Sequence, residues 1–281
     1  MTFFVTPALR TLIDLALTED IGNGDPTSEA IFQNHEQAVA RLMVKSPLVL
    51  CGAPLIEPIV FRVDDTIDIT LDKREGSFLF PGDCIATLKG CARSLLMIER
   101  TLLNFIQYLS GIATQTRELT ALAGPGVRLT DTRKTLPGWR YLAKYAVRTG
   151  GGANHRLDLG GGIMIKDNHI DVAGSIDAAV KLVRKGAPHT LQIEVEARTE
   201  DEVKQAIAAG AHIVMLDNMP PPLMKTICGR YRGQAIFEAS GGITGDTLEA
   251  VADTGVDVIS LGALTHSIKA MDISMKMELL S

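Results

Sequence analysis

Apolar residues recur at helical spacing in two segments of the first half of the chain. In the first segment the spaced positions are Leu9, Leu12, Ile13, Ala16 and Leu17. Thr6 can cap the start of that helix, and Pro7 suits its first turn because a residue there needs no N–H donor. The second segment keeps the same period from about residue 94 to residue 123. The pattern therefore predicts a short helix near the start and a long helix later in this half.

Between these helices, residues 38–90 have the pattern of short strands. In "TIDITL" the residues Ile67, Ile69 and Leu71 alternate with polar ones, which is typical of a sheet with one solvated face. "FPGD" at 80–83 is a turn sequence. We expect an α/β domain in this part of the chain.

The second half alternates short apolar runs with amphipathic helices. The runs are "VRLT", "GIMI", "LQIEV", "HIVML", "AIF" and "DVISL". Landmarks at the ends of the last four, Glu196, Asp217, Ser240 and Gly262, are separated by 21, 23 and 22 residues. Repeated βα units of this length predict a parallel sheet, as in a doubly wound fold or a β/α barrel. The regular period favours the barrel, and six strands rather than eight make it an incomplete one.

Composition narrows the class of protein. The chain has 281 residues and a formal net charge of −5, which argues against a general nucleic-acid or membrane-surface binder. Its four cysteines form no CxxC pair, so we expect reduced thiols in a cytoplasmic protein. The start "MTFFVTPALR" lacks a secretory pattern, and the longest apolar run is broken by Glu57 and two prolines.

Positive charge is concentrated in one segment of this acidic chain. Residues 131–156 carry six Arg or Lys and His155 against one acid, Asp131. Such a cluster suggests a small anionic ligand. Polar clusters also follow each of the six apolar runs, and the carboxyl ends of barrel strands meet on one face. We therefore expect these clusters to form one site.

Two features of that face indicate a phosphate and a metal. The glycines of "SGG" at 240–242 and "LGA" at 261–263 let backbone N–H groups approach a phosphate, although they can also be tight turns only. Glu194 and Glu196 share one face of their strand. With Asp217 on the next strand, these carboxylates offer a pair of oxygen ligands from neighbouring strands, which suits Mg²⁺ that holds a phosphorylated substrate. The alternative is that these carboxylates only pair with the nearby cations.

The motifs together resemble one family. They are "EDIGNGDPTS", "ERTLLNFIQYLSGIAT", "DTRKTLPGWRYLAKYAVRTGGGANHR", "IKDNH", "EVE", "LDNM", "EASGGI" and "GALTHS", in order from about residue 14 onward. They resemble quinolinate phosphoribosyltransferase, also called nicotinate-nucleotide pyrophosphorylase (carboxylating). Molybdenum-transport-associated paralogues are similar, but the full "KDNH" and "GALTHS" strings favour the enzyme. The resemblance implies an α/β fold: an N-terminal α/β sandwich domain over 1–110, with 268–281 packing back on it, and an incomplete β/α barrel over 111–267.

The resemblance also implies an activity. This family of pentosyltransferases joins quinolinate to 5-phosphoribosyl-1-pyrophosphate with Mg²⁺. The products are nicotinate mononucleotide, pyrophosphate and CO₂, in NAD biosynthesis. It implies a homodimer or a dimer-based assembly, in which Arg100 of one subunit completes the site of the other.

The matching strings carry site roles to this chain. The quinolinate carboxylates would be held by Arg133, His155, Arg156 and Lys166, with Arg100 and Thr132 at the same site. Lys134, Glu196 and Asp217 would be catalytic, and the last two would also serve Mg²⁺. The 5-phosphate would be lined by Ser240, Gly241, Gly242, Leu261, Gly262 and Ala263, with His266 nearby. Gly161 departs from the family pattern, which has an acidic residue there.

Two other functions stay open from the sequence. A non-catalytic phosphosugar-binding barrel would keep the two glycine motifs but would need neither Lys166 nor the pair Glu196 and Asp217. A phosphoribosyltransferase acting on another aromatic acid would keep all of these residues. The sequence does not distinguish a dimer from a hexamer.

Overall fold

The computed structural model describes residues 3–32 and 36–280 and divides the chain into two compact units. The first unit is drawn from three stretches, Met1–Gln115, Pro137–Gly150 and Ile268–Ser281. The second unit comprises Thr116–Leu136 and Gly151–Ser267.

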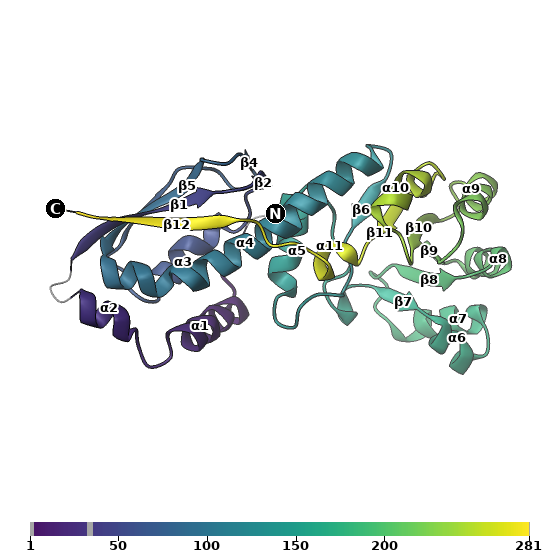
Figure 1. Cartoon of the computed structure of the whole chain (residues 1–281). Helices are drawn as coiled ribbons and strands as arrows, with labels where there is room; N and C mark the ends of the chain where they lie inside the picture. The colour runs from purple at the N-terminus through teal and green to yellow at the C-terminus, as the bar shows by residue number, and fades with distance from the viewer. Residues whose placement is uncertain (1–2, 33–35, 281) are drawn as a thin grey trace. The chain divides into compact units, whose positions relative to one another are not determined.

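A four-stranded antiparallel sheet forms the centre of the first unit. Its strand order is β12 (Ile273–Leu279), β1 (Gln37–Val44), β5 (Cys84–Cys91) and β3 (Asp68–Leu71). The strand latest in the sequence therefore lies beside the earliest one, with Leu42 opposite Met275 (Figure 1). Alternate residues of β1 are buried, as a sheet with one covered face requires. A two-stranded sheet, β2 (Leu48–Val49) and β4 (Phe78–Leu79), accompanies it.

The helices of the first unit begin where the sequence indicates. Helix α1 (Pro7–Ile21) has Thr6 as its N-cap, which accepts a hydrogen bond from the Leu9 N–H. Helix α4 (Ala92–Ala123) covers the predicted 94–123 segment, and its residues from 116 onward belong to the second unit. Three short helices were not predicted: α2 (Pro26–Ile31), η1 (Ala53–Leu55) and α3 (Ile56–Val60). The expectation of strands throughout 38–90 is wrong at residues 53–60.

Part of the predicted cationic cluster belongs to the first unit. Helix α5 (Arg140–Thr149) carries Arg140, Lys144 and Arg148. At its start, Trp139 stacks on Phe105 of α4 with ring centroids 4.6 Å apart. The positive charge of residues 131–156 is thus divided between the units.

Six parallel strands form the sheet of the second unit, in the order β6-β11-β10-β9-β8-β7. They are β6 (Arg128–Thr130), β7 (Ile163–Ile165), β8 (Ile193–Ala197), β9 (Ile213–Asp217), β10 (Ile236–Ser240) and β11 (Val258–Ser260). Each overlaps one of the six apolar runs, although β10 extends three residues beyond "AIF". The predicted fold class is therefore confirmed: a mixed α/β chain with an N-terminal sheet domain and a C-terminal parallel sheet. A further bridge pairs Thr130 with Ala153.

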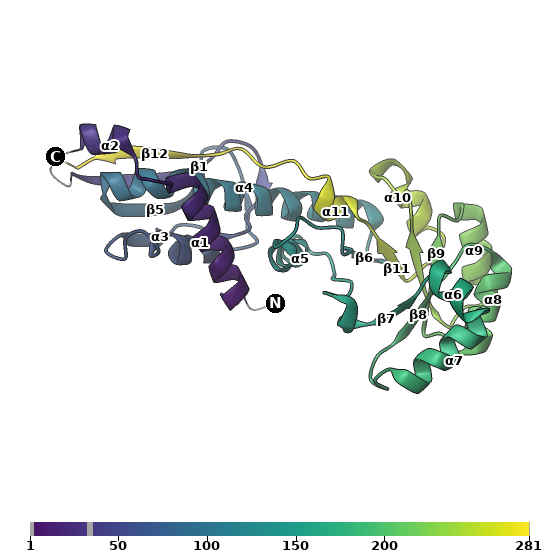
Figure 2. The same cartoon turned by 90° about the horizontal axis from the view of Figure 1, so that it is seen from below.

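Helices follow the strands, as βα units require. They are α6 (Asp167–Ala173), α7 (Ile176–Gly186), α8 (Glu200–Ala209), α9 (Pro221–Arg230), α10 (Gly245–Ala252) and α11 (Ala263–His266). Figure 2 shows α7, α8 and α9 along one side of β7, β8 and β9. Thr199 and Glu202 form a capping box at the start of α8. Among the described residues, no helix combines the length and apolar character that crossing a membrane needs.

Candidate active site

Opposite charges meet at the carboxyl ends of β7 and β8. Lys166 follows β7 directly, and Glu196 lies near the end of β8, which pairs with β7. The Lys166 ammonium forms an ion pair with the Glu196 carboxylate, which is mostly buried. Two predicted site residues, separated by 30 positions in sequence, are therefore in direct contact.

Asp217 stands at the end of the next strand, β9, and faces Arg198. The Arg198 Nε lies 3.5 Å from the Asp217 Oδ2, and the same guanidinium lies 2.8 Å from the Asp167 Oδ2 at the start of α6. The Arg198 side chain is 59% exposed, so this bridge can open without the loss of a buried contact. Arg198 is not among the site residues predicted from the sequence.

Two arginines predicted to bind the substrate lie close enough to influence each other. Burial, followed by the charge of Arg133, lowers the pKa of Arg156 below its ordinary value. The Arg156 Nη1 donates a hydrogen bond to the Gly162 carbonyl at 2.9 Å. Like charges held near each other bind an anion well, because the anion removes their repulsion. A side chain on Gly161, the residue that departs from the family pattern, would contact Arg156, since its Cβ would lie 3.4 Å from the Arg156 Cβ.

The loop after β6 is fixed by a buried carboxylate. Asp131 is fully buried and accepts hydrogen bonds from the His155 N–H at 2.9 Å and the Asn154 amide at 2.6 Å. Further along the loop, the Lys134 N–H donates to the Thr132 Oγ1. Asp131 thus joins the loop after β6 to the segment that carries His155.

The glycine motifs at the ends of β10 and β11 are tightly packed. Gly241 has a φ of 92°, and a side chain there would overlap Asn218, which follows Asp217. A Cβ at Gly262 would lie 2.8 Å from the His266 Nε2 and 3.1 Å from the Lys134 Cδ, so these two side chains would have to move. Lys134, Gly262 and His266, all predicted at the phosphosugar, are therefore neighbours.

The second unit holds the predicted site residues with one exception. They are Thr132, Arg133, Lys134, His155, Arg156, Lys166, Glu196, Asp217, Ser240, Gly241, Gly242, Leu261, Gly262, Ala263 and His266. Arg100 lies instead on α4 of the first unit, where its side chain is exposed.

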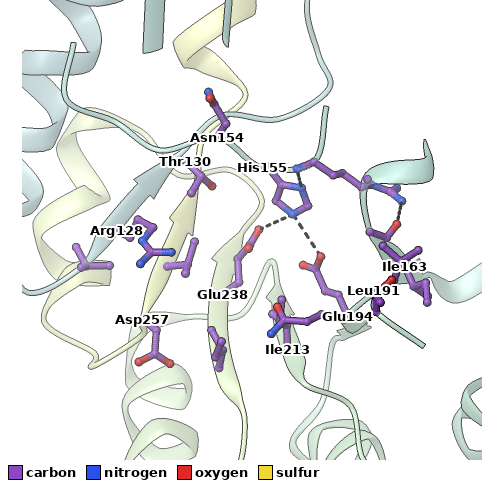
Figure 3. A pocket seen from close by; sticks show the side chains of 18 of the residues that line it. Arg128, Thr130, Asn154, His155, Ile163, Leu191, Glu194, Ile213, Glu238 and Asp257 are labelled. Atoms are coloured by element: carbon purple, nitrogen blue, oxygen red, sulfur yellow. Dashed lines mark hydrogen bonds and ion pairs between the residues drawn. The ribbon is translucent and has the colours of Figure 1, made fainter. Parts of the chain in front are cut away.

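A cluster of ionisable groups lies inside the sheet of the second unit. The His155 Nε2 is 3.3 Å from the Glu194 Oε2 of β8 and 3.6 Å from the Glu238 Oε1 of β10 (Figure 3). Both carboxylates are 4% exposed. Burial and then the charge of Glu194 raise the pKa of Glu238 to about 7. We call these three residues the interior cluster.

A cavity of about 810 Å³ lies beside the interior cluster. First residues of several strands line it, among them Arg128, Ile163 and Ile213, so it opens toward the amino ends of the strands. Of the predicted substrate residues, His155 and Arg156 line it. Because barrel enzymes act at the carboxyl ends of their strands, we assign the chemistry to that edge rather than to this cavity.

Potential metal ligands occur in two places. Glu196 and Asp217 offer carboxylate oxygens at neighbouring strand ends, a donor set that suits Mg²⁺. Within the described part of the chain, the ligand atoms of the interior cluster also lie within 4.8 Å of one another. The predicted pair is not part of that group.

Sequence reasoning missed Asp131, Asn218, Arg198 and Glu238 as parts of this region. A signal for Glu238 was present, because it lies two residues before Ser240 on the same strand and therefore on the same face. Asp131 and Asn218 adjoin residues that were selected. Arg198 has no comparable signal, since only the folded chain brings it to Asp167 and Asp217.

Comparison with known proteins now adds to this geometry. The family model for the quinolinate phosphoribosyl transferase N-terminal domain matches residues 25–110, and the model for the C-terminal domain matches residues 112–276. A Bacillus subtilis protein named probable nicotinate-nucleotide pyrophosphorylase (carboxylating) is 47% identical over 272 residues, covering 96% of this chain and 94% of that protein. An Oryza sativa relative, named nicotinate-nucleotide pyrophosphorylase (carboxylating), chloroplastic, is 40% identical over 96% of this chain and 78% of its own length.

Solved structures agree with this relationship. The crystal structure of NadC from Streptococcus pyogenes has a TM-score of 0.95 and 37% identity, with both chains fully covered. The nicotinate-nucleotide pyrophosphorylase from Francisella tularensis has a TM-score of 0.91 and 39% identity, covering 97% of this chain and 98% of the other. The two matched domain models, the identity of the relatives and these structures lead to one conclusion: the chain belongs to the quinolinate phosphoribosyltransferase family.

Proposed function

We propose that this enzyme transfers the phosphoribosyl group of 5-phosphoribosyl-1-pyrophosphate to quinolinate and releases CO₂, giving nicotinate mononucleotide and pyrophosphate in NAD biosynthesis. The observation that carries the proposal is that the charges of Arg133 and Glu196 both act on Arg156, while Glu196 pairs with Lys166 at the carboxyl ends of β8 and β7. Both substrates are multiply anionic. A half-buried arrangement of cations that repel each other is suited to bind them.

The cations hold the diacid in this proposal. Arg133, Arg156 and Lys166 bind the two quinolinate carboxylates and orient the ring nitrogen toward the ribose. His155, predicted to bind a carboxylate as well, has both ring nitrogens facing protein groups and instead supports Arg156. That nitrogen is the nucleophile, so no protein nucleophile is needed. Once the nitrogen is bonded to ribose and positively charged, loss of the neighbouring carboxylate as CO₂ leaves electron density beside N⁺. The surrounding cations stabilise that charge, because fixed groups need no reorganisation in a buried site.

The phosphosugar lies over the glycine motifs. Backbone N–H groups at Ser240, Gly241 and Gly242 and at Leu261, Gly262 and Ala263 bind the 5-phosphate, and α10 begins just after the first motif. Lys134 and His266 flank Gly262, and they place positive charge beside the departing pyrophosphate. Glu196 and Asp217 face the ribose carbon, where positive charge develops as pyrophosphate leaves.

Magnesium fits the same two carboxylates. Their present partners, Lys166 and Arg198, have side chains that are 43% and 59% exposed, so both carboxylates can exchange a cation for a metal contact. Mg²⁺ prefers oxygen ligands and commonly reaches phosphates through one or two carboxylates. Bound magnesium supplies neutralising charge to the pyrophosphate.

We further propose a homodimer in which Arg100 completes the site of the neighbouring subunit. Its support is that Arg100 is exposed on α4 and lies in a different unit from the other site residues.

A cytoplasmic location is proposed from the cysteines. All four are free thiols, which suits a reducing compartment.

The direct test is to incubate the protein with quinolinate, 5-phosphoribosyl-1-pyrophosphate and Mg²⁺ and to follow nicotinate mononucleotide. We expect the product to form, and to fall steeply in Lys166→Ala. Lys181→Ala is the matched control. The Lys181 side chain is exposed on α7, and its ion pair is with Asp177, one turn earlier on the same helix. A wild-type protein that binds both substrates but releases no product would contradict the proposed reaction.

A further inference from the structure

The interior cluster has a defined proton arrangement. The Arg156 N–H donates a hydrogen bond to the His155 Nδ1 at 2.8 Å, so Nδ1 carries no proton. The ring proton is therefore on Nε2, which points at Glu194 and Glu238 (Figure 3). A ring nitrogen that accepts an N–H bond leaves the other nitrogen to donate. The two glutamates thus hold His155 in one tautomer and one orientation.

This arrangement argues against a metal ion in the cluster. A metal on Nε2 of a neutral imidazole would require the proton to be on Nδ1. That proton would meet the Arg156 N–H, which already points at Nδ1. The three residues are therefore better suited to orient a side chain than to bind a metal.

The dipeptide His155–Arg156 is also fixed by a main-chain hydrogen bond. The His155 N–H donates to the buried Asp131, and the His155 ring accepts from the next N–H, that of Arg156. The peptide from which the Arg156 side chain extends is therefore held through the ring and through the main chain. The guanidinium of Arg156 donates to the Gly162 carbonyl and lies close enough to Arg133 for that charge to lower its pKa.

We propose that Glu194 and Glu238 are positioning residues for quinolinate binding, which act through His155 to orient Arg156. This inference rests on the proposed function, because it gives Arg156 a substrate. Neither glutamate needs to touch quinolinate. The proposal also gives a role to the buried Glu238 Oε1, which has no hydrogen-bond partner among the described residues and lies 3.6 Å from the His155 Nε2.

Steady-state kinetics of Glu194→Gln and Glu238→Gln test the proposal. We expect the KM for quinolinate to rise about tenfold, the scale of one weakened charge-assisted contact, with a much smaller change in kcat and in the KM for the phosphoribosyl donor. Partial unfolding alone would lower kcat in proportion to the active fraction and leave both KM values unchanged. Glu249→Gln, at an exposed position on α10, is the control and should match the wild type.

Chemical rescue gives a second readout. Glu238→Ala opens space beside a cavity of about 810 Å³, so acetate can reach the position of the lost carboxylate. We expect acetate, but not chloride at the same ionic strength, to lower the raised KM for quinolinate.

In parallel, ¹⁵N NMR should show His155 as the Nε2–H tautomer in the wild type, and this preference should weaken when both glutamates are replaced.

These outcomes separate the two proposals. A wild-type protein that makes no nicotinate mononucleotide overturns the proposed function, and the NMR result then still tests the cluster. An active wild type whose glutamate variants keep the KM for quinolinate overturns the positioning role. A His155 ring protonated on Nδ1 overturns it as well.

Discussion

Glu196 and Asp217 stand at the ends of neighbouring strands, but their partners differ. Glu196 pairs with Lys166, which we assign to quinolinate, whereas Asp217 pairs with Arg198 on the loop that leads into α8. Substitution of Glu196 therefore disturbs both substrates. Asp217 can be changed with less effect on the cations that hold the diacid.

Asp217→Asn is thus expected to impair the phosphoribosyl transfer while it leaves quinolinate binding largely intact. We predict that quinolinate affinity stays within a few-fold of the wild type, while turnover falls by about 10²–10³ and the Mg²⁺ requirement rises. Calorimetric titration with quinolinate and the Mg²⁺ dependence of the rate measure the two effects. Loss of quinolinate binding with an unchanged metal dependence would contradict this division of the site.

The raised pKa of Glu238 links stability to pH. Its value of about 7 in the folded protein lies above the ordinary 4.5, so between these values the folded state binds more protons than the unfolded state. The stabilisation is fully present below pH 4.5 and is lost as the pH rises through about 7. Its slope is at most about 1.4 kcal/mol per pH unit.

Glu238→Gln removes this titration. We therefore expect the wild type to lose stability relative to the variant as the pH rises from about 5 to about 8. Urea unfolding of both proteins across this range measures the difference, with Glu249→Gln as the control. A constant difference between wild type and Glu238→Gln would show that Glu238 has the same pKa in both states.

At the scale of elements, regular apolar patterns were sufficient to predict helices and strands, whereas short apolar segments were not. The six runs of the second unit overlap β6 to β11, because largely buried parallel strands are rich in apolar residues. The short elements η1 and α3 lie within "APLIEPIV", which has too few residues to distinguish a helix from a strand. The contact of His155 with Glu238 could not be predicted from the sequence, since no local pattern connects a loop residue to a strand so distant in the chain.

Pairing between β12 and β1 contributes to the stability of the first unit, and truncation of the chain tests this contribution. A chain ending at Asp272 lacks β12, so one edge of β1 is left unpaired. This chain also loses the buried Ile273. We expect the loss of at least about 2 kcal/mol of stability, the scale of one buried aliphatic side chain. Amide hydrogen exchange of residues 38–44 should become much faster.

A chain ending at Leu279 keeps the whole strand and is the control. Equal protection of residues 38–44 in both truncated chains would mean that β1 does not depend on β12.

At the scale of the whole molecule, the division of the site residues predicts complementation. Arg100 lies in the first unit and Lys134 in the second. If a dimer joins them across subunits, Arg100→Ala mixed with Lys134→Ala gives hybrid dimers with one intact site. Random exchange then restores about a quarter of the sites, since half of the dimers are hybrids.

Activity after exchange, compared with each variant alone, measures this recovery. Mass spectrometry of tagged subunits verifies that exchange has occurred. Exchanged but inactive mixtures would show that each site is built from one chain.

The division of the first unit among three stretches of sequence also constrains the order of folding during synthesis. The ribosome releases β1 long before β12, and the whole of the second unit is made in between. The nascent chain can complete its parallel sheet while β1 still lacks one neighbour. Until residues 273–279 emerge, this strand exposes unpaired backbone groups, which are a template for association with other chains. Slow translation over the last strand should therefore favour aggregation, and a chaperone that shields β1 at this stage should raise the yield of folded protein.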